Sequence, residues 1–390
     1  PSTAHVALFN SLSVERKDLV GIDATAGVSA VAADGRELPC QVLQVEGKKR
    51  LYFVTPAIPG FSSRTLQFKQ APQPTAESTE LRATPSQVES PFYRLRIDQN
   101  TGGVASLVHK ATGTELVRGD QGNGLCQTVY FDGQDHALTG VTSKVIASGP
   151  VLARLQVQGV VQKIRVTTQI SVYAELDRVD FDVRIHKPLD TKQERLCQMF
   201  PLLDETATVR AATAGAIVQP KTQPLGDLLP GGDPSRFSVW ELINVARDDM
   251  SVTVAPLDAF ALRLDLKSLA FEALGNDQNY REVTKDQHGV TDFRFRYSVR
   301  AHADGYEKAQ AVCFARAAST PLLHVVGRPD QDSLDLPTIA LDPQRVIATC
   351  LKPADDRTLG DCILRLWEIA GRSGPATLNL DGYQKAITTD

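Results

Sequence analysis

The sequence lacks the features that mark membrane proteins and nucleic-acid-binding proteins. It has no apolar run of the ~18 residues needed to cross a bilayer, and its opening segment 1–5 has no basic region followed by an apolar one, as a signal peptide would. The formal net charge of -4 provides no chain-wide attraction to phosphate backbones or anionic lipid. We therefore expect neither a nucleic-acid partner nor a membrane partner.

Cysteines are few and widely spaced, without a C-x-x-C pair. The six are Cys40, Cys126, Cys197, Cys313, Cys350 and Cys362. Disulfide scaffolds and zinc modules place their cysteines at short spacings, so we expect free buried thiols and a reducing cytoplasm. A periplasmic location stays open, because the chain begins at Pro1 without an initiator methionine and is expected to be part of a longer polypeptide.

Motifs of common catalytic and metal sites are also missing. There is no G-x-S-x-G, no H-E-x-x-H and no glycine-rich phosphate loop. His302 lies close to Asp304, and Asp132, Asp135 and His136 form a weaker group. Zinc needs three or four converging ligands, and neither group has a further ligand at a sequence spacing that is typical of zinc sites. We therefore interpret them as turn residues and predict no metal site.

The sequence does contain a strong period-two alternation of apolar and polar residues. It runs through four segments, 163–172, 179–186, 260–267 and 293–300. In the third segment Phe260, Leu262, Leu264 and Leu266 form the apolar side. Antiparallel sheets with one solvated face give this alternation. We predict an all-β, mainly antiparallel fold with two packed sheets, and one helix over 304–318, where alanine-rich composition follows a possible Asp304 cap.

Composition also suggests where domains begin and end. Segment 70–91 is rich in Pro, Ser, Thr and Gln, and 327–335 is a second break. We predict three units: a small β domain over 1–84, a large β-sandwich over 85–325, and a truncated β unit over 326–390. A loop over 221–236 interrupts the large domain, and at this length it is expected to serve contact rather than stability.

Segment 92–117 has the pattern of a β-hairpin. Its first strand alternates around Tyr93, Leu95 and Ile97, and the turn 100–103 ends in two glycines. The spacing partly resembles a calcium loop, but such a loop needs a bidentate glutamate where this chain has His109. We predict a hairpin without calcium.

Aromatic residues make up only 6% of the sequence, with two tryptophans. Trp367 lies in a strand that is apolar on both sides, so we expect it to be buried. Trp240 follows the long loop, and two alternatives remain for it: an exposed ring that stacks on a sugar, or a ring buried in the core. Arg236, Trp240 and Asp258 are the candidate carbohydrate contacts, since they offer a planar donor fork, an amphipathic ring and a hydroxyl acceptor.

Several short segments, in order along the chain, carry a family resemblance. They are 9–16 (FNSLSVER), 92–117, 241–264, 297–302 and 364–371. They resemble motifs of the C-terminal β region of glycoside hydrolase family 38, the α-mannosidases. These motifs include F-N-x-L-S-W-x-R, with Val14 here in place of tryptophan, the hairpin F-Y-R-V-x-x-D-x-x-T-G-G-I-x-S-L, Y-x-x-x-x-H, and R-L-Y/W-E-x-x-x-G.

The resemblance implies a large mutarotase-like supersandwich flanked by smaller β-sandwich units. It also implies zinc-assisted, retaining hydrolysis of α-mannosides by the whole enzyme. The zinc ligands and the aspartate nucleophile of the family belong to an N-terminal (β/α) catalytic domain, which nothing in this sequence matches. We therefore assign no catalytic residue, no metal and no cofactor to this chain, and expect zinc in the missing domain.

The predicted function is that of a non-catalytic β region, inactive alone, which supports the catalytic domain and shapes its cleft for a mannoside-type glycan. Its expected partners are that domain and carbohydrate. The alternative is a free-standing carbohydrate-binding or mutarotase-like β protein. The encoding reading frame distinguishes them, because a long upstream region with a zinc-type His/Asp set favours the enzyme and a start codon near Pro1 favours the free-standing protein.

Overall fold

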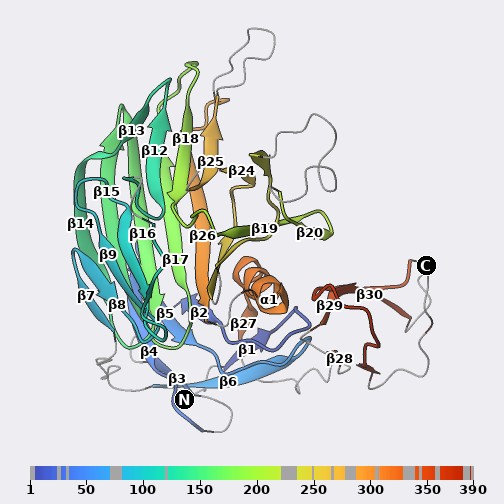
Figure 1. Cartoon of the computed structure of the whole chain (residues 1–390). Coiled ribbons are helices and arrows are strands. Elements are labelled where there is room, and N and C mark those ends of the chain that lie inside the picture. Colours follow the sequence, from blue (N-terminus) through green and yellow to red (C-terminus); the bar gives the residue numbers. More distant parts are fainter. Residues whose placement is uncertain are drawn as a thin grey trace. The chain divides into compact units, whose positions relative to one another are not determined.

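The computed structural model describes residues 5–23, 28–31, 35–70, 81–118, 122–220, 235–247, 250–264, 268–276, 287–303, 306, 308–327, 339–341, 345–355, 361–380 and 387. Within these ranges the chain is almost entirely antiparallel β-structure, with one helix, α1 (Lys308–Ser319) (Figure 1). The predicted all-β fold class is confirmed, and the helix begins later than expected. No helix in the described ranges is long and apolar enough to cross a membrane.

The chain forms two compact units. The central unit is Glu77–Tyr306, and the terminal unit combines Pro1–Ala76 with Glu307–Asp390. The terminal unit thus joins both ends of the chain, a grouping that the composition breaks did not indicate. The division into 1–84, 85–325 and 326–390 stays a prediction.

The central unit contains three antiparallel sheets. The nine-stranded sheet has the order β14 (Thr139–Ser148), β15 (Leu152–Val161), β16 (Ile164–Tyr173), β17 (Val179–His186), β26 (Asp292–His302), β23 (Met250–Pro256), β22 (Ile243–Arg247), β19 (Thr208–Thr213), β20 (Ala216–Val218). The six-stranded sheet has the order β13 (Asp135–Ala137), β12 (Gln127–Phe131), β18 (Arg195–Phe200), β25 (Leu269–Gly275), β24 (Ala261–Leu264), β21 (Arg236–Ser238). The five-stranded sheet has the order β11 (Thr114–Glu115), β10 (Val104–His109), β9 (Tyr93–Ile97), β8 (Gln87–Glu89), β7 (Arg82–Thr84).

The predicted alternation determines which side of each strand is buried. β17 alternates strictly between buried and half-buried residues. Ile170 of β16 lies opposite Phe181 of β17, and both side chains are buried. The polar residues between them point to the other side of the nine-stranded sheet, because successive side chains on a strand face opposite sides. We call that side the polar face.

Four aromatic rings join the two largest sheets. Phe181 and Tyr297 come from the nine-stranded sheet, and Phe200 and Phe271 from the six-stranded one. The centroid of Phe200 lies 5.1 Å from Tyr297 and 5.3 Å from Phe271, and each of the four side chains is at most 1% exposed. Burying one such ring contributes about 2 kcal/mol. We call this set the aromatic cluster, and it shows that the two sheets pack face to face.

The predicted hairpin forms from β9 and β10. The Gly102 N–H donates to the Asp98 carbonyl at 2.9 Å, and Gly102 has φ +76°, a conformation that favours glycine. At Gly103 an added Cβ would lie 2.9 Å from the Cα of Gly124, so the close approach of these two backbones excludes a side chain.

The terminal unit contains smaller antiparallel sheets and α1. Its four-stranded sheet has the order β27 (Leu323–Gly327), β1 (His5–Phe9), β6 (Ser63–Gln70), β3 (Val28–Val31), and its three-stranded sheet β2 (Leu19–Asp23), β5 (Lys48–Val54), β4 (Cys40–Val45). Two ribbons pair β28 (Ile339–Leu341) with β31 (Leu378–Leu380) and β29 (Val346–Pro353) with β30 (Cys362–Glu368). The pairing of β1 with β27 connects the first strand to a strand more than 300 residues later.

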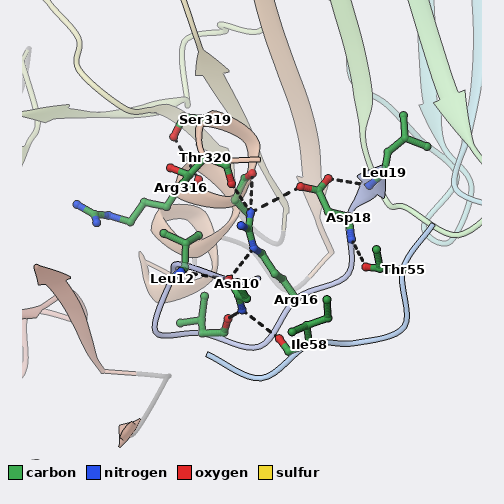
Figure 2. A network of polar contacts seen from close by, with 12 residues as sticks. Asn10, Leu12, Arg16, Asp18, Leu19, Thr55, Ile58, Arg316, Ser319 and Thr320 are labelled. Carbon is green, nitrogen blue, oxygen red and sulfur yellow. Dashed lines mark hydrogen bonds and ion pairs between the residues drawn. The ribbon is translucent and has the colours of Figure 1, made fainter. Parts of the chain in front are cut away.

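A buried arginine connects the N-terminal segment of this unit to the end of α1. Arg16, in the FNSLSVER segment, is 7% exposed. Its Nη1 donates to the carbonyl oxygens of Ala317 at 3.1 Å and Thr320 at 2.5 Å. The last carbonyls of a helix lack partners within the helix and carry partial negative charge, so a guanidinium there both satisfies and neutralises them (Figure 2).

Asn10 and Asp18 hold this guanidinium from the other side. Asn10 Oδ1 accepts a hydrogen bond from Arg16 Nε at 2.9 Å, while its Nδ2 donates to the carbonyls of Val14 and Ile58. Asp18 Oδ2 lies 3.6 Å from Arg16 Nη1, and both side chains are at most 6% exposed. A buried charge is tolerated only when paired and hydrogen-bonded, and this network meets both conditions.

The thiols and Trp367 depart in part from the predictions. All six cysteines are free, as expected, but only Cys40, Cys126 and Cys197 are buried. Trp367 is half-buried rather than buried, and Arg316 lies 5.7 Å from its ring centroid. The strand around it is not enclosed on both sides, since Leu366 is 40% exposed. Two-stranded ribbons leave one side uncovered, which sequence alternation does not reveal.

We predict that Arg16→Ala lowers the free energy of unfolding by about 3 kcal/mol, because it leaves Asp18 and the helix carbonyls buried without their partner. Urea denaturation followed by far-UV circular dichroism measures the loss. Arg64→Ala, at an exposed position on β6, is the matched control and should change stability by less than about 0.5 kcal/mol. Equal effects of the two substitutions would contradict the assignment.

Candidate carbohydrate-contact site

The three predicted carbohydrate contacts lie around the β21–β24 ladder of the central unit. Arg236 begins β21, Trp240 follows that strand by two residues, and Asp258 lies three residues before β24. Because Ser238 pairs with Ala261, Trp240 and Asp258 lie toward the same end of the ladder, while Arg236 lies at the other end. Of the predicted contact loop 221–236, residues 221–234 lie outside the described residues.

Arg236 belongs to a charged cluster that the sequence analysis did not predict. Its Nη2 lies 3.0 Å from Glu272 Oε2, and Arg263 Nη1 lies 3.3 Å from Glu272 Oε1. Glu272 is only 7% exposed, whereas each arginine side chain is about a third exposed. The two arginines are directly opposite each other in the register, where like charges are destabilising. The carboxylate between them therefore holds both guanidinium groups in place.

These charged residues share one side of the six-stranded sheet, the side away from the aromatic cluster, which we call its outer face. One row across the sheet is Gln127, Met199, Ala270, Arg263 and Arg236. The next row includes Cys197 and Glu272, which are direct register partners. Burial, and then the charge of Glu272, raise the pKa of Cys197 to about 12. A thiol in that state is not a nucleophile at neutral pH, so it packs rather than reacts.

Two large aromatic side chains are exposed at the Trp240 end of the ladder. Trp240 is 66% exposed and Phe260 is 67% exposed. Their backbones are held close, because the Val239 N–H donates to the Phe260 carbonyl at 2.7 Å and the Trp240 N–H donates to the Ala212 carbonyl at 2.9 Å. Exposed aromatic rings on a fixed backbone are suited to stacking on the apolar face of a sugar.

Asp258 forms an ion pair with Arg296 and is not a free carboxylate. Its Oδ2 accepts hydrogen bonds from the Arg296 backbone N–H at 2.9 Å and from Nε at 2.8 Å, and its Oδ1 accepts one from Nη2 at 2.9 Å. This pairing raises the pKa of Arg296. A carboxylate has about four lone-pair positions, and three are used here. The pair as a whole, rather than the carboxylate, is the group that could meet a ligand.

Phe260 was wrongly assigned to the buried side of its strand. The alternation Phe260, Leu262, Leu264 continues through the sequence, but β24 begins only at Ala261. Leu262 and Leu264 are buried as predicted, whereas Phe260 is exposed. Alternation determines which face of a sheet a side chain points to only where the strand is paired. Phe260 lies one residue before the paired part of β24, so its orientation does not follow the alternation.

The contact of Glu272 with Arg263 and Arg236 was missed for a different reason. The alternation over 260–267 places Arg263 on the polar side of its strand, but it does not show what that side chain contacts. The contact depends on the pairing of β21, β24 and β25. That register is a long-range property which one sequence does not encode locally.

No metal site is found among the residues that the structure describes, where no three His, Cys, Asp or Glu side chains converge. His302 is buried, with Nε2 2.9 Å from Thr253 Oγ1, and Asp304 lies outside the described residues. His136 Nε2 lies 2.9 Å from Asp132 Oδ1 in a two-residue pair. These groups make structural hydrogen bonds.

The exposed groups of the candidate site have the chemistry needed for binding. Exposed rings offer stacking, and partly exposed guanidinium groups offer donors to sugar hydroxyls. Acid–base cleavage of a glycoside needs one carboxylic acid poised to give up a proton. Glu272 and Asp258 are instead each paired with arginine, Glu272 with Arg236 and Asp258 with Arg296.

Comparisons with known proteins identify the fold. No family model matches the sequence, and no curated protein matches it. The solved structure of an α-mannosidase from Enterococcus faecalis V583 superimposes on 97% of this chain with a TM-score of 0.75 at 14% identity. A glycosyl hydrolase family 38 protein from Enterococcus faecalis superimposes on 98% with a TM-score of 0.72 at 15% identity.

The chain spans about half the length of these two structures, 52% and 54%. A putative aldose 1-epimerase from Escherichia coli K12 superimposes on 56% of the chain, with a TM-score of 0.38 at 12% identity. The chain therefore has a family 38-like fold along nearly its whole length.

We predict that Glu272→Gln destabilises the protein by about 1 to 2 kcal/mol, since it leaves two facing guanidinium groups without the charge between them. The free energy of urea unfolding measures this. Glu205→Gln removes a carboxylate at an exposed position and should be neutral within about 0.5 kcal/mol. A Glu272→Gln protein as stable as this control would show that the charged cluster does not hold β21 in place.

Proposed function

We propose that this chain is the non-catalytic β region of an α-mannosidase-like glycoside hydrolase. It supports a zinc-dependent catalytic domain outside this chain and helps to shape the carbohydrate cleft. The observation that carries the proposal is the superposition of 97% of the chain on about half of an α-mannosidase structure. Nearly half of that structure has no counterpart here, which leaves room for a separate catalytic domain.

The arrangement around β21 supports a carbohydrate-contact role within this function. Trp240 and Phe260 provide exposed rings, and Glu272 holds the Arg236 fork in a fixed orientation. The partners of such a surface are the hydroxyl groups and apolar faces of a mannoside-type glycan. The six free thiols support a reducing compartment such as the cytoplasm.

A second candidate function is that of a free-standing carbohydrate-binding or mutarotase-like β protein. The exposure of Trp240 and Phe260 favours it, because these rings are accessible without any other domain. The two functions differ in what the chain does alone. A free-standing protein binds, or interconverts the anomers of, a free sugar, whereas a supporting region acquires its full affinity only beside its catalytic domain.

We predict that the chain alone hydrolyses no α-mannoside and binds no stoichiometric zinc, since the described residues contain no converging ligand set. The measurements are release of nitrophenol from an aryl α-mannoside and the zinc content of the dialysed protein. Turnover above background that a chelator abolishes would contradict both the prediction and the assigned division of labour. Anomer interconversion, followed by polarimetry, would favour the second candidate.

We predict that Trp240→Ala weakens methyl α-mannoside binding about fivefold, equivalent to the ~1 kcal/mol of a stacking contact. Stability should stay within about 0.5 kcal/mol, because the ring is exposed. In a Trp367→Phe background Trp240 is the one remaining tryptophan, so quenching of its fluorescence reports sugar binding directly.

Leu189→Ala, which removes another exposed apolar side chain elsewhere, 50% exposed, is the control for Trp240→Ala. If both variants bind the mannoside like the unmodified protein, as measured by calorimetry, Trp240 is not a sugar contact. A large loss of stability in Trp240→Ala would instead identify a packing role.

A further inference from the structure

The polar face of the nine-stranded sheet contains a shallow depression of about 350 Å³ over β15, β16 and β17. Its lining includes the side chains of Gln158, Arg165, Thr167, Arg184 and His186. The depression lies on a different sheet from Arg236 and Glu272, and none of the three predicted carbohydrate contacts lines it. The candidate site above therefore does not account for it.

The strand register gathers these five side chains on one side. Thr167 of β16 lies opposite both Gln158 of β15 and Arg184 of β17. In the next row on the same face, Arg165 lies opposite His186. Directly opposite residues have Cβ atoms about 5 Å apart, and diagonal ones about 7–8 Å. Arg165 and Arg184 are diagonal neighbours, so one small ligand can reach both.

The carboxylates around the depression are already engaged. Asp182 accepts two hydrogen bonds from Arg294, at 2.9 and 2.6 Å, and lies 3.8 Å from Arg184. Asp292 accepts one hydrogen bond from the Thr291 hydroxyl at 2.8 Å and pairs with His186 at 2.9 Å.

Arg165 forms no ion pair within 4.0 Å with a carboxylate of the described residues. At longer range its charge acts on Asp292, whose pKa is lowered first by the hydrogen bond with His186 and also by Arg165. Arg165 is also exposed, so it is accessible to a ligand. The depression therefore carries a local excess of positive charge, although the whole chain has a net charge of -4.

This set of groups fits one class of ligand. Two guanidinium forks recognise a planar carboxylate or a phosphate through paired hydrogen bonds. The Gln158 amide and the Thr167 hydroxyl, which are themselves hydrogen-bonded at 3.1 Å, can donate to and accept from neighbouring hydroxyl groups. A neutral sugar would leave the Arg165 charge without an anionic partner, whereas an anionic sugar provides one and can also use the amide and hydroxyl groups.

We propose that this depression binds the oxyanion of a sugar acid or sugar phosphate, held between Arg165 and Arg184, with Gln158 and Thr167 contacting adjacent hydroxyl groups. The saccharide part of this inference rests on the proposed carbohydrate function, and the oxyanion part does not. The depression is thus a second subsite, selective for charged glycans.

Isothermal titration calorimetry of the full chain at low salt tests the inference. The probes are mannose 6-phosphate, glucuronate, inorganic phosphate and methyl α-mannoside. We expect the two charged sugars to bind, with mannose 6-phosphate at least threefold tighter than inorganic phosphate. We expect Arg165→Ala and Arg184→Ala each to weaken binding of the charged sugars about tenfold, as for the loss of one charge-assisted hydrogen bond.

Two variants separate this site from general charge effects. Arg154→Ala removes an arginine from the same face, where it donates to Ser171 at 2.7 Å outside the depression, and it should bind the charged sugars normally. Arg165→Lys keeps the charge but loses the fork, and should bind between the unmodified protein and Arg165→Ala. Thermal melts show that each variant is folded, since all the altered side chains are at least partly exposed.

Failure of this inference can be told apart from failure of the proposed function. Absent binding of both charged sugars, or equal losses in Arg154→Ala and Arg165→Ala, would overturn the oxyanion site. Equal affinity for inorganic phosphate and mannose 6-phosphate would overturn its saccharide part. Binding of methyl α-mannoside that depends on Trp240 and not on Arg165 would leave the proposed function standing.

Discussion

The contact of Phe200 with Phe271 and Tyr297 decides which side of each large sheet is buried, and the surface chemistry follows from it. Side chains alternate along a strand, so fixing one buried ring fixes the orientation of every neighbour on that strand. Tyr297 turned inward leaves Arg296 and Asp258 on the polar face. A slip of one residue would place those charges in the core. Both candidate binding surfaces therefore depend on the packing that buries the aromatic cluster.

The parts of the fold that sequence could predict are those encoded by neighbouring residues. The alternation over 163–172 and 179–186 predicted both strands and their buried sides, and the 92–117 hairpin follows from its turn glycines. The predictions that Phe260 and Trp367 are buried were wrong, because burial there depends on where strand pairing and the covering layers end. In the candidate site, exposed Trp240 was one of two open alternatives, while the position of Glu272 between two arginines needed the register of three strands.

The role of Arg16 shows the same limit over a longer distance. In the sequence, segment 9–16 carries a family resemblance but no pattern that predicts burial of Arg16. The carbonyl groups that Arg16 satisfies lie 301 and 304 residues later in the chain. A buried arginine costs several kcal/mol in desolvation unless its partners are in place, so this contact makes the N-terminal segment and α1 mutually dependent. That dependence explains why one compact unit contains both ends of the chain.

Net charge is a weak guide to what such a protein binds, and the nine-stranded sheet shows why. The value of -4 describes an average over 390 residues, and at physiological ionic strength charges act over only about 8 Å. A ligand on the polar face therefore responds to a few strands rather than to the chain. There the register places Asp182 opposite Arg296 and diagonal to Arg294, with which it forms hydrogen bonds, and it leaves Arg165 diagonal to Arg184. Selectivity for a charged group thus arises from which residues face each other across strands, a property that composition cannot contain.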